Sequence, residues 1–412
     1  MKKGLFIILD GLGDHPNKLL GNKTPLEAAK KENINKLVRK SEAGIVDTVA
    51  PGFVPGSDTG HLSLFGYDVD KYYKGRGIFE ALGNNIELEE GDIAFRLNFG
   101  TVDNNKILID RRIGRNDYGL EELLKDFEDV KEKIEKEYGI KIIIKHGVEH
   151  RGVLVIKGLK SEKVTDNDLH KENIKVPEIK YLDKEAKETV EVLNKLVEEF
   201  YNFSKNHKIN KERKEKDLPE INYLLIRSSS KYEKLKEEDL FPNKYNVKAI
   251  FLAAAPMYLG VAKYVGMDIY KPLGTTGTAD ENLFSFVEAA ISYRDKYDIV
   301  FIHIKGTDSL SHDKKPIEKK KLIERIDKEL VEKIKDEFDV IAMTGDHSTS
   351  SILGRHTSDP VPIFIYSENA RSGFVKEFSE RKCIKGTLGR IKGTDVIKIF
   401  LDKIDKYIMY GS

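Results

Sequence analysis

Six side chains that can bind a metal ion follow short apolar runs of this chain or lie in a loop close to one. They are Asp10, Asp308, His312, Asp346, His347 and His356. Asp10 closes an apolar run near the N-terminus, and residues 299–304 and 340–343 form apolar runs that lead to four of the others. Ligands of open α/β sheets bind beyond the carboxyl ends of the strands, so we expect these side chains to meet. Three carboxylates and three imidazoles predict two sites with mixed ligands, which suit Mn²⁺, Zn²⁺ or another first-row ion better than Mg²⁺.

A candidate nucleophile lies in the segment VPGSDTGHLSLFGYD, residues 54–68. Ser57 follows Pro55-Gly56 and precedes an amphipathic stretch. One interpretation is that Ser57 caps a helix, with Asp58 favouring the helix dipole. The other is that Ser57 is a nucleophile at a helix N-terminus, where backbone N–H groups favour negative charge. A serine beside bound metal ions can become an activated nucleophile without a neighbouring base.

Several nucleophile and nucleotide motifs are missing from the sequence. The surroundings of Ser57 do not read G-x-S-x-G, so the nucleophile elbow of α/β hydrolases is absent. The stretch GRGIFE at residues 75–80 imitates G-x-G-x-x-G but has Glu at the third glycine position and no preceding strand. Neither a G-x-x-x-x-G-K-[ST] motif nor a cysteine-based zinc motif occurs.

Short apolar strands alternate with longer amphipathic helices in the outer parts of the chain, which is typical of a mostly parallel α/β sheet. The predicted strands are residues 5–9, 223–226, 249–253, 299–304, 340–343 and 363–366. The predicted helices are residues 25–41, 279–293, 317–337 and 394–406. Thr24 and Pro25 suit the N-cap and first position of the first helix.

The middle of the chain has a different composition, which predicts an inserted α+β domain. Its short β-like pieces are residues 94–98, 106–110, 140–144 and 153–156, and its charged helices are residues 120–138 and 184–206. The very polar stretch 205–216 predicts a solvated helix end or a linker. We therefore expect one domain from residues 1–76 and 231–412, interrupted by a second at residues 77–230.

The bulk composition excludes some classes of protein. The 412 residues contain 70 Lys and Arg against 69 Asp and Glu, and a net charge of +1 does not support a broad nucleic-acid surface. The single Cys383 excludes an internal disulfide and indicates a reducing compartment. Asp10 ends the N-terminal apolar run too early for a signal peptide, and no run reaches the length of a membrane helix. We expect a soluble, cytoplasmic protein.

The chain resembles the archaeal-type cofactor-independent phosphoglycerate mutases of the alkaline phosphatase superfamily. The resemblance covers nearly the whole length and rests on the segments ILDGLGD, VPGSDTGHLSLFGYD, GRGIFEALG, DRRIGR, KAIFLAAAPMYLGVAKYVGMD, KGTDSLSHD, TGDHSTS and RHTSDPVP. It implies an α/β, alkaline-phosphatase-like, mostly parallel sheet flanked by helices. The insert at residues 77–230 would be the substrate-binding or lid domain.

The resemblance also implies roles for individual residues. Ser57 corresponds to the serine that becomes phosphorylated. One metal ion would be held by Asp10, Asp346, His347 and Ser57, and the second by Asp308, His312 and His356. The expected substrate-binding residues are Arg111, Arg115, His150, Arg151 and Arg227, with Lys305 as an additional phosphate contact. For each arginine an ordinary surface charge is the alternative, because the archaeal insert differs from that of the bacterial and plant enzymes.

The implied reaction is the interconversion of 3-phosphoglycerate and 2-phosphoglycerate through phosphoserine, independent of 2,3-bisphosphoglycerate, in glycolysis and gluconeogenesis. The expected cofactors are two divalent metal ions, with Mn²⁺ ahead of Mg²⁺, Zn²⁺ or Co²⁺. The expected partner is the small-molecule substrate, with no nucleic acid and no membrane, and the oligomeric state is open. The insert is expected to close over the site, because water that reached phosphoserine would hydrolyse it.

Other functions compete with this interpretation. A metal-dependent phosphatase, a phosphonate hydrolase or a phosphopentomutase of the same superfamily would use nearly the same metal ligands. A sulfatase is disfavoured because Ser57 is followed by Asp58-Thr59-Gly60 rather than the C/S-x-P-x-R context. A non-catalytic binding protein would leave the strand-end Asp and His residues unexplained.

Overall fold

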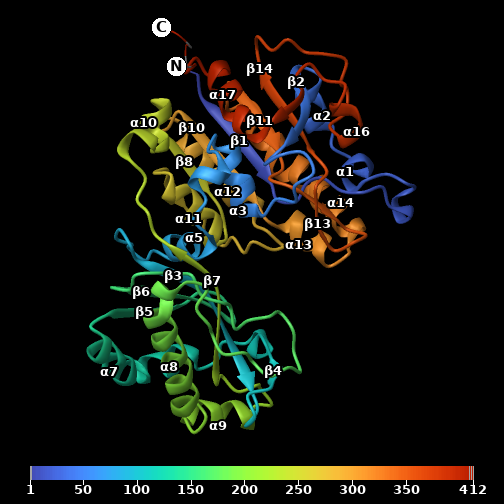
Figure 1. Cartoon of the computed structure of the whole chain (residues 1–412). Coiled ribbons are helices and arrows are strands. Elements are labelled where there is room, and N and C mark those ends of the chain that lie inside the picture. The colour runs from blue at the N-terminus through green and yellow to red at the C-terminus, as the bar shows by residue number, and fades with distance from the viewer. Residues whose placement is uncertain (1, 408, 410, 412) are drawn as a thin grey trace. The chain divides into compact units, whose positions relative to one another are not determined.

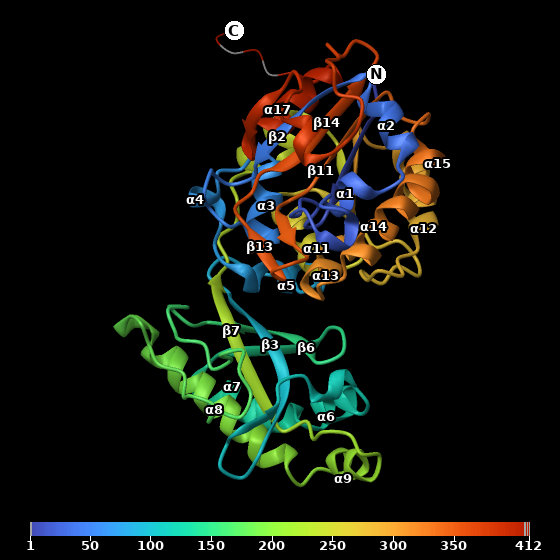
Figure 2. The same ribbon diagram turned by 90° about the vertical axis from the view of Figure 1, so that its right-hand side faces the viewer.

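The chain forms two compact units in the computed structural model, which describes residues 2–407, 409 and 411 (Figure 1). The first unit comprises the residues up to Tyr73 and those from Leu235 onward. The second unit comprises Lys74–Lys234. The chain thus leaves the first unit once and returns to it once, and each unit has a sheet of its own (Figure 2).

The first unit is built on an eight-stranded sheet with the order β15-β2-β14-β11-β1-β10-β8-β9. Its strands are β1 (Gly4–Leu9), β2 (Ser41–Asp47), β8 (Ala249–Leu252), β9 (Asp268–Tyr270), β10 (Ile299–Ile304), β11 (Val340–Thr344), β14 (Val361–Ser367) and β15 (Gly389–Lys392). The strands from β11 to β9 run parallel, whereas β14 is antiparallel to both of its neighbours. All residues of β1 are buried, which explains why this central strand is continuously apolar. The predicted fold class, a mostly parallel α/β sheet with flanking helices, is confirmed.

Helices cover both faces of this sheet (Figure 1). Leu5, Ile7 and Leu9 of β1 share an apolar core with residues of α2, α12 and α14. On the opposite face Phe6 lies against Phe400 of α17, with ring centroids 5.4 Å apart. The helices of this unit are α1 (Pro25–Ala28), α2 (Glu32–Val38), α3 (Ser57–Leu64), α4 (Val69–Tyr72), α10 (Phe241–Tyr245), α11 (Pro256–Tyr264), α12 (Leu283–Arg294), α13 (Gly306–His312), α14 (Pro316–Arg325), α15 (Glu332–Ile334), α16 (Glu380–Cys383) and α17 (Gly393–Lys403).

The register of the parallel strands brings their carboxyl ends to the same level. Leu9 of β1 is opposite Ile304 of β10, and Ile8 is opposite Thr344 of β11. The backbone N–H of Asp10 donates to the carbonyl of Ile304 at 3.0 Å, so the ladder continues to the first polar residue. Whatever follows β1, β10 and β11 in sequence therefore starts at one edge of the sheet.

The second unit is a five-stranded antiparallel sheet in which β7 also pairs with β3. Its elements are α5 (Arg76–Gly83), β3 (Ile93–Val102), β4 (Leu108–Asp110), α6 (Leu120–Asp126), α7 (Glu128–Tyr138), β5 (Lys141–His146), β6 (Arg151–Lys157), α8 (Lys187–Ser204), α9 (Lys208–Glu215) and β7 (Tyr223–Lys231). Phe95, Leu97 and Phe99 of β3 lie in its apolar core. Because side chains alternate along a strand, Arg96 and Asn98 lie on the other face.

Several predicted elements differ from those observed. The helix predicted for residues 25–41 is two helices, α1 and α2, and Ser41 already belongs to β2, an interior strand. The helix predicted for residues 317–337 contains a π-helical stretch, Ile326–Val331, between α14 and α15. There Asp327 accepts hydrogen bonds from the backbone N–H groups of Asn33 and Ile34 at the start of α2. Residues 205–216 include the helix α9, whose Arg213 is fully buried.

None of the helices among the described residues is both long enough and apolar enough to cross a membrane.

Candidate active site

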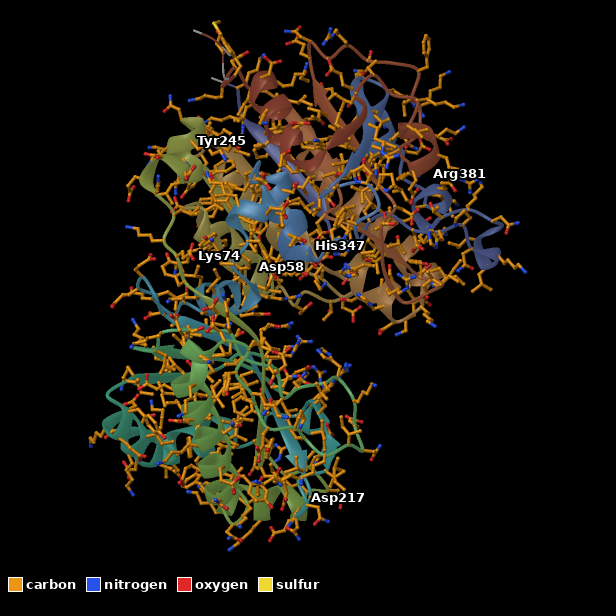
Figure 3. All side chains as sticks on the ribbon, viewed as in Figure 1. Asp58, Lys74, Asp217, Tyr245, His347 and Arg381 are labelled. Carbon is orange, nitrogen blue, oxygen red and sulfur yellow. The ribbon has the colours of Figure 1, made fainter. Side chains whose placement is uncertain are left out.

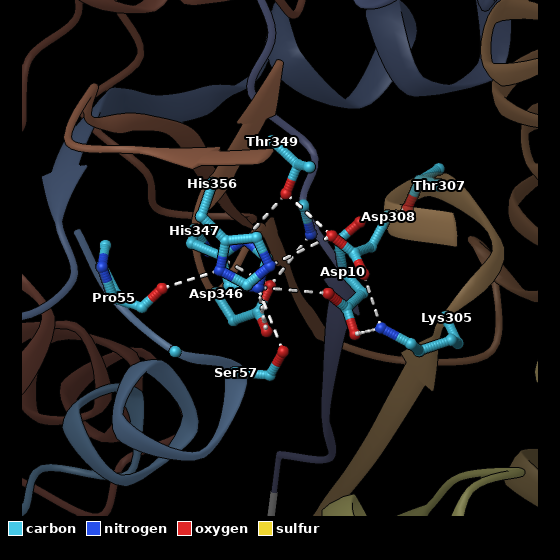
Figure 4. A network of polar contacts seen from close by, with 12 residues as sticks. Asp10, Pro55, Ser57, Lys305, Thr307, Asp308, Asp346, His347, Thr349 and His356 are labelled. Atoms are coloured by element: carbon cyan, nitrogen blue, oxygen red, sulfur yellow. Dashed lines mark hydrogen bonds and ion pairs between the residues drawn. The ribbon is translucent and has the colours of Figure 1, made fainter. Parts of the chain in front are cut away.

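The polar residues at the strand ends of the first unit lie close together (Figure 4). Most of them are buried, but His312, the last residue of α13, is exposed. Asp10 follows β1, and Asp308 lies in the first turn of α13, directly after β10. Asp346 and His347 follow β11, and their side chains are fully buried. His356 comes from the short strand β13 (Arg355–Thr357), which pairs with β12 (Ser348–Ser350). All six predicted ligands thus lie in the first unit.

The six ligands form two groups with the spacing of metal sites, Asp10 with Asp346 and His347, and Asp308 with His312 and His356. In the first group the Nε2 atom of His347 lies 3.3 Å from Oδ1 of Asp10 and 3.4 Å from Oδ2 of Asp346. In the second group the Nε2 atoms of both histidines lie 3.4 Å from Oδ1 of Asp308. The rings of His347 and His356 are stacked with centroids 3.7 Å apart, so the groups are adjacent.

Ser57 is the first residue of α3, and its hydroxyl oxygen lies 3.1 Å from Nε2 of His347. The N-cap is Gly56, and Thr59 supplies the hydroxyl that contacts its backbone. The interpretation of Ser57 as a helix cap is therefore wrong. Gly60 makes this position possible, because a Cβ atom there would collide with the backbone oxygen of Asp346. The start of α3 can thus approach the loop after β11 directly.

Hydrogen bonds to the Nδ1 atoms assign the histidine tautomers. Nδ1 of His312 lies 2.9 Å from the carbonyl of Gly354, and Nδ1 of His356 lies 2.8 Å from the carbonyl of Pro55. A carbonyl only accepts, so both Nδ1 atoms carry the proton. In the neutral form of both rings the lone pair is therefore on Nε2, the atom that faces Asp308, as in imidazoles that ligate a metal ion.

Thr349 assigns the tautomer of His347 in the same way. Its hydroxyl donates to Oδ1 of Asp308 at 2.8 Å, because an ionised carboxylate can only accept. It lies 3.0 Å from Nδ1 of His347 and therefore accepts the proton of that atom. The lone pair of Nε2 is then directed at Ser57 and the carboxylates. One hydroxyl thus orients a member of each ligand group.

The charges of the cluster favour bound cations. Burial alone would raise the pKa of Asp10, but Lys305, His303 and His347 hold it well below its ordinary value. For Asp346 no such compensation prevails: burial and the nearby Asp10 raise its pKa well above the ordinary value. Oδ1 of Asp10 and Oδ2 of Asp346 are buried, and neither has a hydrogen-bond partner within the described part of the chain. Divalent ions would satisfy both orphaned oxygens and relieve the repulsion, so the residues present fit a two-metal centre.

Lys305 lies between the two ligand groups. Its ammonium donates to Oδ2 of Asp308 at 2.6 Å and to Oδ2 of Asp10 at 3.2 Å. Burial alone would lower the pKa of Lys305, but Asp10 raises it well above the ordinary value. The amine is therefore charged, and one positive side chain accompanies three carboxylates.

The predicted substrate-binding residues of the insert also lie near one another in the second unit. Asp168 receives two hydrogen bonds from the Arg111 guanidinium, at 2.5 and 2.7 Å, and contacts Nε of Arg227 at 3.0 Å. Burial and Arg151 lower the pKa of His150 to about 3. Arg111, Arg112 and Arg115 contribute to the same shift. The charges therefore form one arginine cluster with His150.

Arg96 joins this cluster, although sequence reasoning did not select it. Burial, Arg76 and Arg227 are among the causes that lower its pKa, to about 9. Glu80 lies 3.1 Å from Nε of Arg96 and partly offsets the repulsion. Two carboxylates, Glu80 and Asp168, lie among a larger number of arginine side chains and neutralise only part of their charge. The positive charge that remains suits an anionic ligand.

The comparisons with known proteins identify the family of the chain. The family model described as 2,3-bisphosphoglycerate-independent phosphoglycerate mutase matches residues 38–210. A Pyrococcus abyssi protein of that name is 40% identical over 415 residues, with 100% of both chains covered. The chain belongs to the 2,3-bisphosphoglycerate-independent phosphoglycerate mutases. It is an isomerase, and phosphoglycerate is its substrate.

Other relatives of the mutase support the assignment. A Pyrobaculum arsenaticum protein with the same description is 42% identical, with 97% of both chains covered. A solved structure of a Pyrococcus horikoshii protein is 35% identical with a TM-score of 0.83, covering 100% of this chain and 99% of that one. The cofactor-independent phosphoglycerate mutase of Thermoplasma acidophilum is 33% identical with a TM-score of 0.67, covering 98% and 100%.

A Ser–His–Asp chain elsewhere in the mutase imitates a hydrolase triad. Ser350 lies 3.1 Å from Nδ1 of His15, whose Nε2 lies 2.9 Å from Asp359. Ser350 is fully buried, and its hydroxyl oxygen already accepts from the backbone N–H groups of Ile352 and Leu353. Its contacts therefore tie loops together and leave no exposed nucleophile.

Replacement of Thr349 tests the orientation of His347 in the mutase. Thr349→Val keeps the shape but removes the hydroxyl that links His347 to Asp308. We expect metal affinity to fall by about 10- to 100-fold, as for other partners of metal ligands. Thr349→Ser restores the hydroxyl and should recover most of the affinity. Isothermal titration with Mn²⁺ measures both variants, and equal affinities for Val and Ser would contradict the assignment.

Proposed function

We propose that the mutase transfers the phosphoryl group through a phosphoserine at Ser57. The main support is the place of its hydroxyl, which is at the start of α3 and 3.1 Å from His347, in contact with the ligand cluster (Figure 4). Figure 3 labels His347 and Asp58, the residue that follows Ser57 in α3, and both lie in the first unit. The N-terminal amides of α3 favour the negative charge of a phosphoryl group on this serine.

The transfer consists of two in-line displacements at phosphorus. Ser57 attacks the phosphorus of 3-phosphoglycerate, the bond to the 3-oxygen breaks, and the glycerate leaves with that oxygen protonated. The 2-hydroxyl of the same glycerate then attacks phosphoserine, which gives 2-phosphoglycerate and frees Ser57. Water is neither consumed nor released. Lys305 provides a fixed positive charge that stabilises the transferring group.

Two divalent metal ions are part of this proposal. Asp10, Asp346, His347 and Ser57 would hold one, and Asp308, His312 and His356 the other. When bound, they act as Lewis acids that lower the pKa of the serine hydroxyl and stabilise charge on phosphorus. Mn²⁺ suits this mixture of carboxylates and imidazoles, with Mg²⁺, Zn²⁺ and Co²⁺ as alternatives. In their neutral forms His312, His347 and His356 have an unprotonated Nε2 atom, so they can bind these ions without a change of tautomer.

The insert at residues 77–230 supplies the cationic contacts for the substrate in this proposal. Arg111, Arg227 and Arg151 offer planar guanidinium groups that suit both the phosphate and the carboxylate of phosphoglycerate. Arg115 and His150 belong to the same cluster. Asp168 holds two of these arginines and leaves their remaining N–H groups for the ligand.

A single coupled assay tests the overall proposal. Metal-loaded protein receives 3-phosphoglycerate without 2,3-bisphosphoglycerate, and enolase converts the product. We expect 2-phosphoglycerate without free phosphate, and an acid-stable phosphate on the peptide that contains Ser57. Release of free phosphate in place of 2-phosphoglycerate would support a phosphatase instead.

Replacement of the arginines tests the substrate contacts. Arg111→Ala and Arg227→Ala should each raise KM for phosphoglycerate by about 10- to 100-fold, since a hydrogen bond to a charged group contributes about 1.5–3 kcal/mol. Arg294→Ala is the control, because this side chain lies in the first unit and forms an ion pair with Glu337. Steady-state kinetics with enolase coupling measures KM. An unchanged KM in both variants would remove the two arginines from the substrate site.

A further inference from the structure

Two buried rings lie directly behind Asp10, and the proposed chemistry does not use them. Tyr258 of α11 is 2% exposed, and His303 of β10 is 1% exposed. Their rings are stacked, with centroids 3.8 Å apart and planes 25° apart. Phe251 lies on the same aromatic assembly, with its centroid 6.3 Å from that of His303. Neither ring can turn away from Asp10 without displacing its neighbours.

Both rings donate to the same oxygen of Asp10. The Tyr258 hydroxyl lies 2.5 Å from Oδ2, and Nε2 of His303 lies 3.1 Å from it. An ionised carboxylate only accepts, so the phenol and the imidazole are the donors. Lys305 adds a third donor to Oδ2 at 3.2 Å. Three donors saturate the lone pairs of this oxygen.

The other oxygen of Asp10 has the opposite environment. Oδ1 is buried and has no hydrogen-bond partner among the residues that the structure describes. It faces the lone pair of Nε2 of His347, 3.3 Å away. Two acceptor atoms at this distance repel each other unless a cation lies between them. The carboxylate is thus divided into a saturated edge and a free edge.

We propose that Tyr258 and His303 are positioning residues that fix Asp10 so that only Oδ1 can bind the ion shared with Asp346 and His347. The stacked pair acts through Asp10 and touches neither the ion nor the substrate. It makes Asp10 a ligand that binds through a single oxygen in a fixed orientation. The hydrogen bonds to Oδ2 withdraw negative charge from the carboxylate, which sets how strongly Oδ1 binds the ion. This inference rests on the proposed role of Asp10 as a metal ligand.

The alternative is that His303 itself binds an ion together with His61 and Asp346, since these three residues also have the spacing of a ligand group. The proton positions argue against it. Nδ1 of His61 lies 2.6 Å from the carbonyl of Ser57 and therefore carries a proton, and Nε2 of His303 donates to Asp10. Their remaining nitrogens, Nε2 of His61 and Nδ1 of His303, are buried and have no hydrogen-bond partner among the described residues. Both imidazoles therefore act as donors to groups of the active site.

Two single-ion backgrounds isolate the ion that Asp10 binds. Asp308→Asn should remove the second ion and leave the ion of Asp10, whereas Asp346→Asn should remove the ion of Asp10 and leave the second. If either background still binds two ions, the proposed metal assignment fails before the inference is tested. Calorimetric titration with Mn²⁺ then gives the Kd of the single remaining ion in each background.

Tyr258→Phe keeps the stacked ring and removes only the hydroxyl. In the Asp308→Asn background we expect it to raise the Kd for Mn²⁺ by about 10- to 100-fold. In the Asp346→Asn background it should leave Kd unchanged. His303→Phe, which keeps an aromatic ring without the N–H, should give the same pattern of Kd changes. The conclusion then does not depend on a single substitution. Equal changes of Kd in both backgrounds, or no change in either, would overturn the inference.

Two further measurements separate positioning from a purely structural role. Tyr245→Phe is the matched control, because its buried hydroxyl contacts the backbone of Phe65 and Gly66 rather than a metal ligand. It should leave both Kd values unchanged. In the otherwise native enzyme, Tyr258→Phe should lower kcat at limiting Mn²⁺, recover it at saturating Mn²⁺ and leave KM for phosphoglycerate unchanged. A wild-type stoichiometry of three ions that falls to two in His303→Phe would favour the alternative site.

Discussion

Replacement of Ser57 by alanine is expected to abolish mutase turnover. Loss of a covalent nucleophile lowers kcat by several orders of magnitude, about 10⁴-fold or more. The six carboxylate and imidazole ligands remain in place, so at least one bound ion should persist. Enolase-coupled kinetics measures turnover, and mass spectrometry of acid-quenched enzyme measures the phosphoserine. Neither activity nor phosphorylation should be detectable.

Ser63→Ala provides the matched control on the same helix. Ser63 is buried, and its hydroxyl has no hydrogen-bond partner within the described residues, so its loss should change neither folding nor kcat appreciably. Substantial mutase activity in Ser57→Ala, with Ser63→Ala normal, would remove Ser57 from the role of nucleophile. Phosphate on a different residue would have the same consequence.

Replacement of Asp308 by asparagine should have the second largest effect. Oδ1 of Asp308 faces the Nε2 atoms of His312 and His356, and Oδ2 pairs with Lys305. The amide removes the negative charge that holds a cation against two neutral imidazoles. We expect the bound metal to fall from two ions to one and kcat to fall by about 10³-fold, because one of the two ions that stabilise the transition state is lost.

Elemental analysis after gel filtration measures the metal content of Asp308→Asn. Asp313→Asn is the control, since Asp313 directly follows the same helix but is exposed and forms an ion pair with Lys315. It should retain two ions and full activity. Unchanged metal stoichiometry in Asp308→Asn would contradict the ligand assignment, whatever the activity. Ala substitutions of His312 and His356 should also lower the stoichiometry.

The alternation of apolar and amphipathic segments was sufficient to predict the fold class, because a parallel sheet must bury both faces of its strands. β1, β10 and β11 are therefore recognisable from composition alone. β2 was not recognised, since its sequence SEAGIVD contains polar residues and follows a helical pattern without a strong break. Its place between β14 and β15 depends on partners more than 300 residues away, which no local pattern encodes.

The polar stretch 205–216 was predicted to be a solvated helix end or a linker, but Arg213 is an exception. It lies in the highly charged stretch of α9 and is nevertheless fully buried. Its guanidinium donates to the backbone carbonyls of Ile113, Tyr118 and Pro219, at 3.0, 2.8 and 2.6 Å. Composition cannot identify such a residue, because its acceptors are backbone atoms of distant loops.

The sequence alone determined which residues could serve the chemistry. Polar groups after β1, β10 and β11 must start at one edge, since parallel strands bring their carboxyl ends together, and long ordered motifs identified the family. Only the tertiary structure decided which atoms are free to act. The tautomers, the two unlike oxygens of Asp10 and the contact of Ser57 with His347 depend on Thr349, Tyr258 and His303. Those partners come from a short hairpin, a helix and a strand interior, where nothing in the local sequence distinguishes them from core residues.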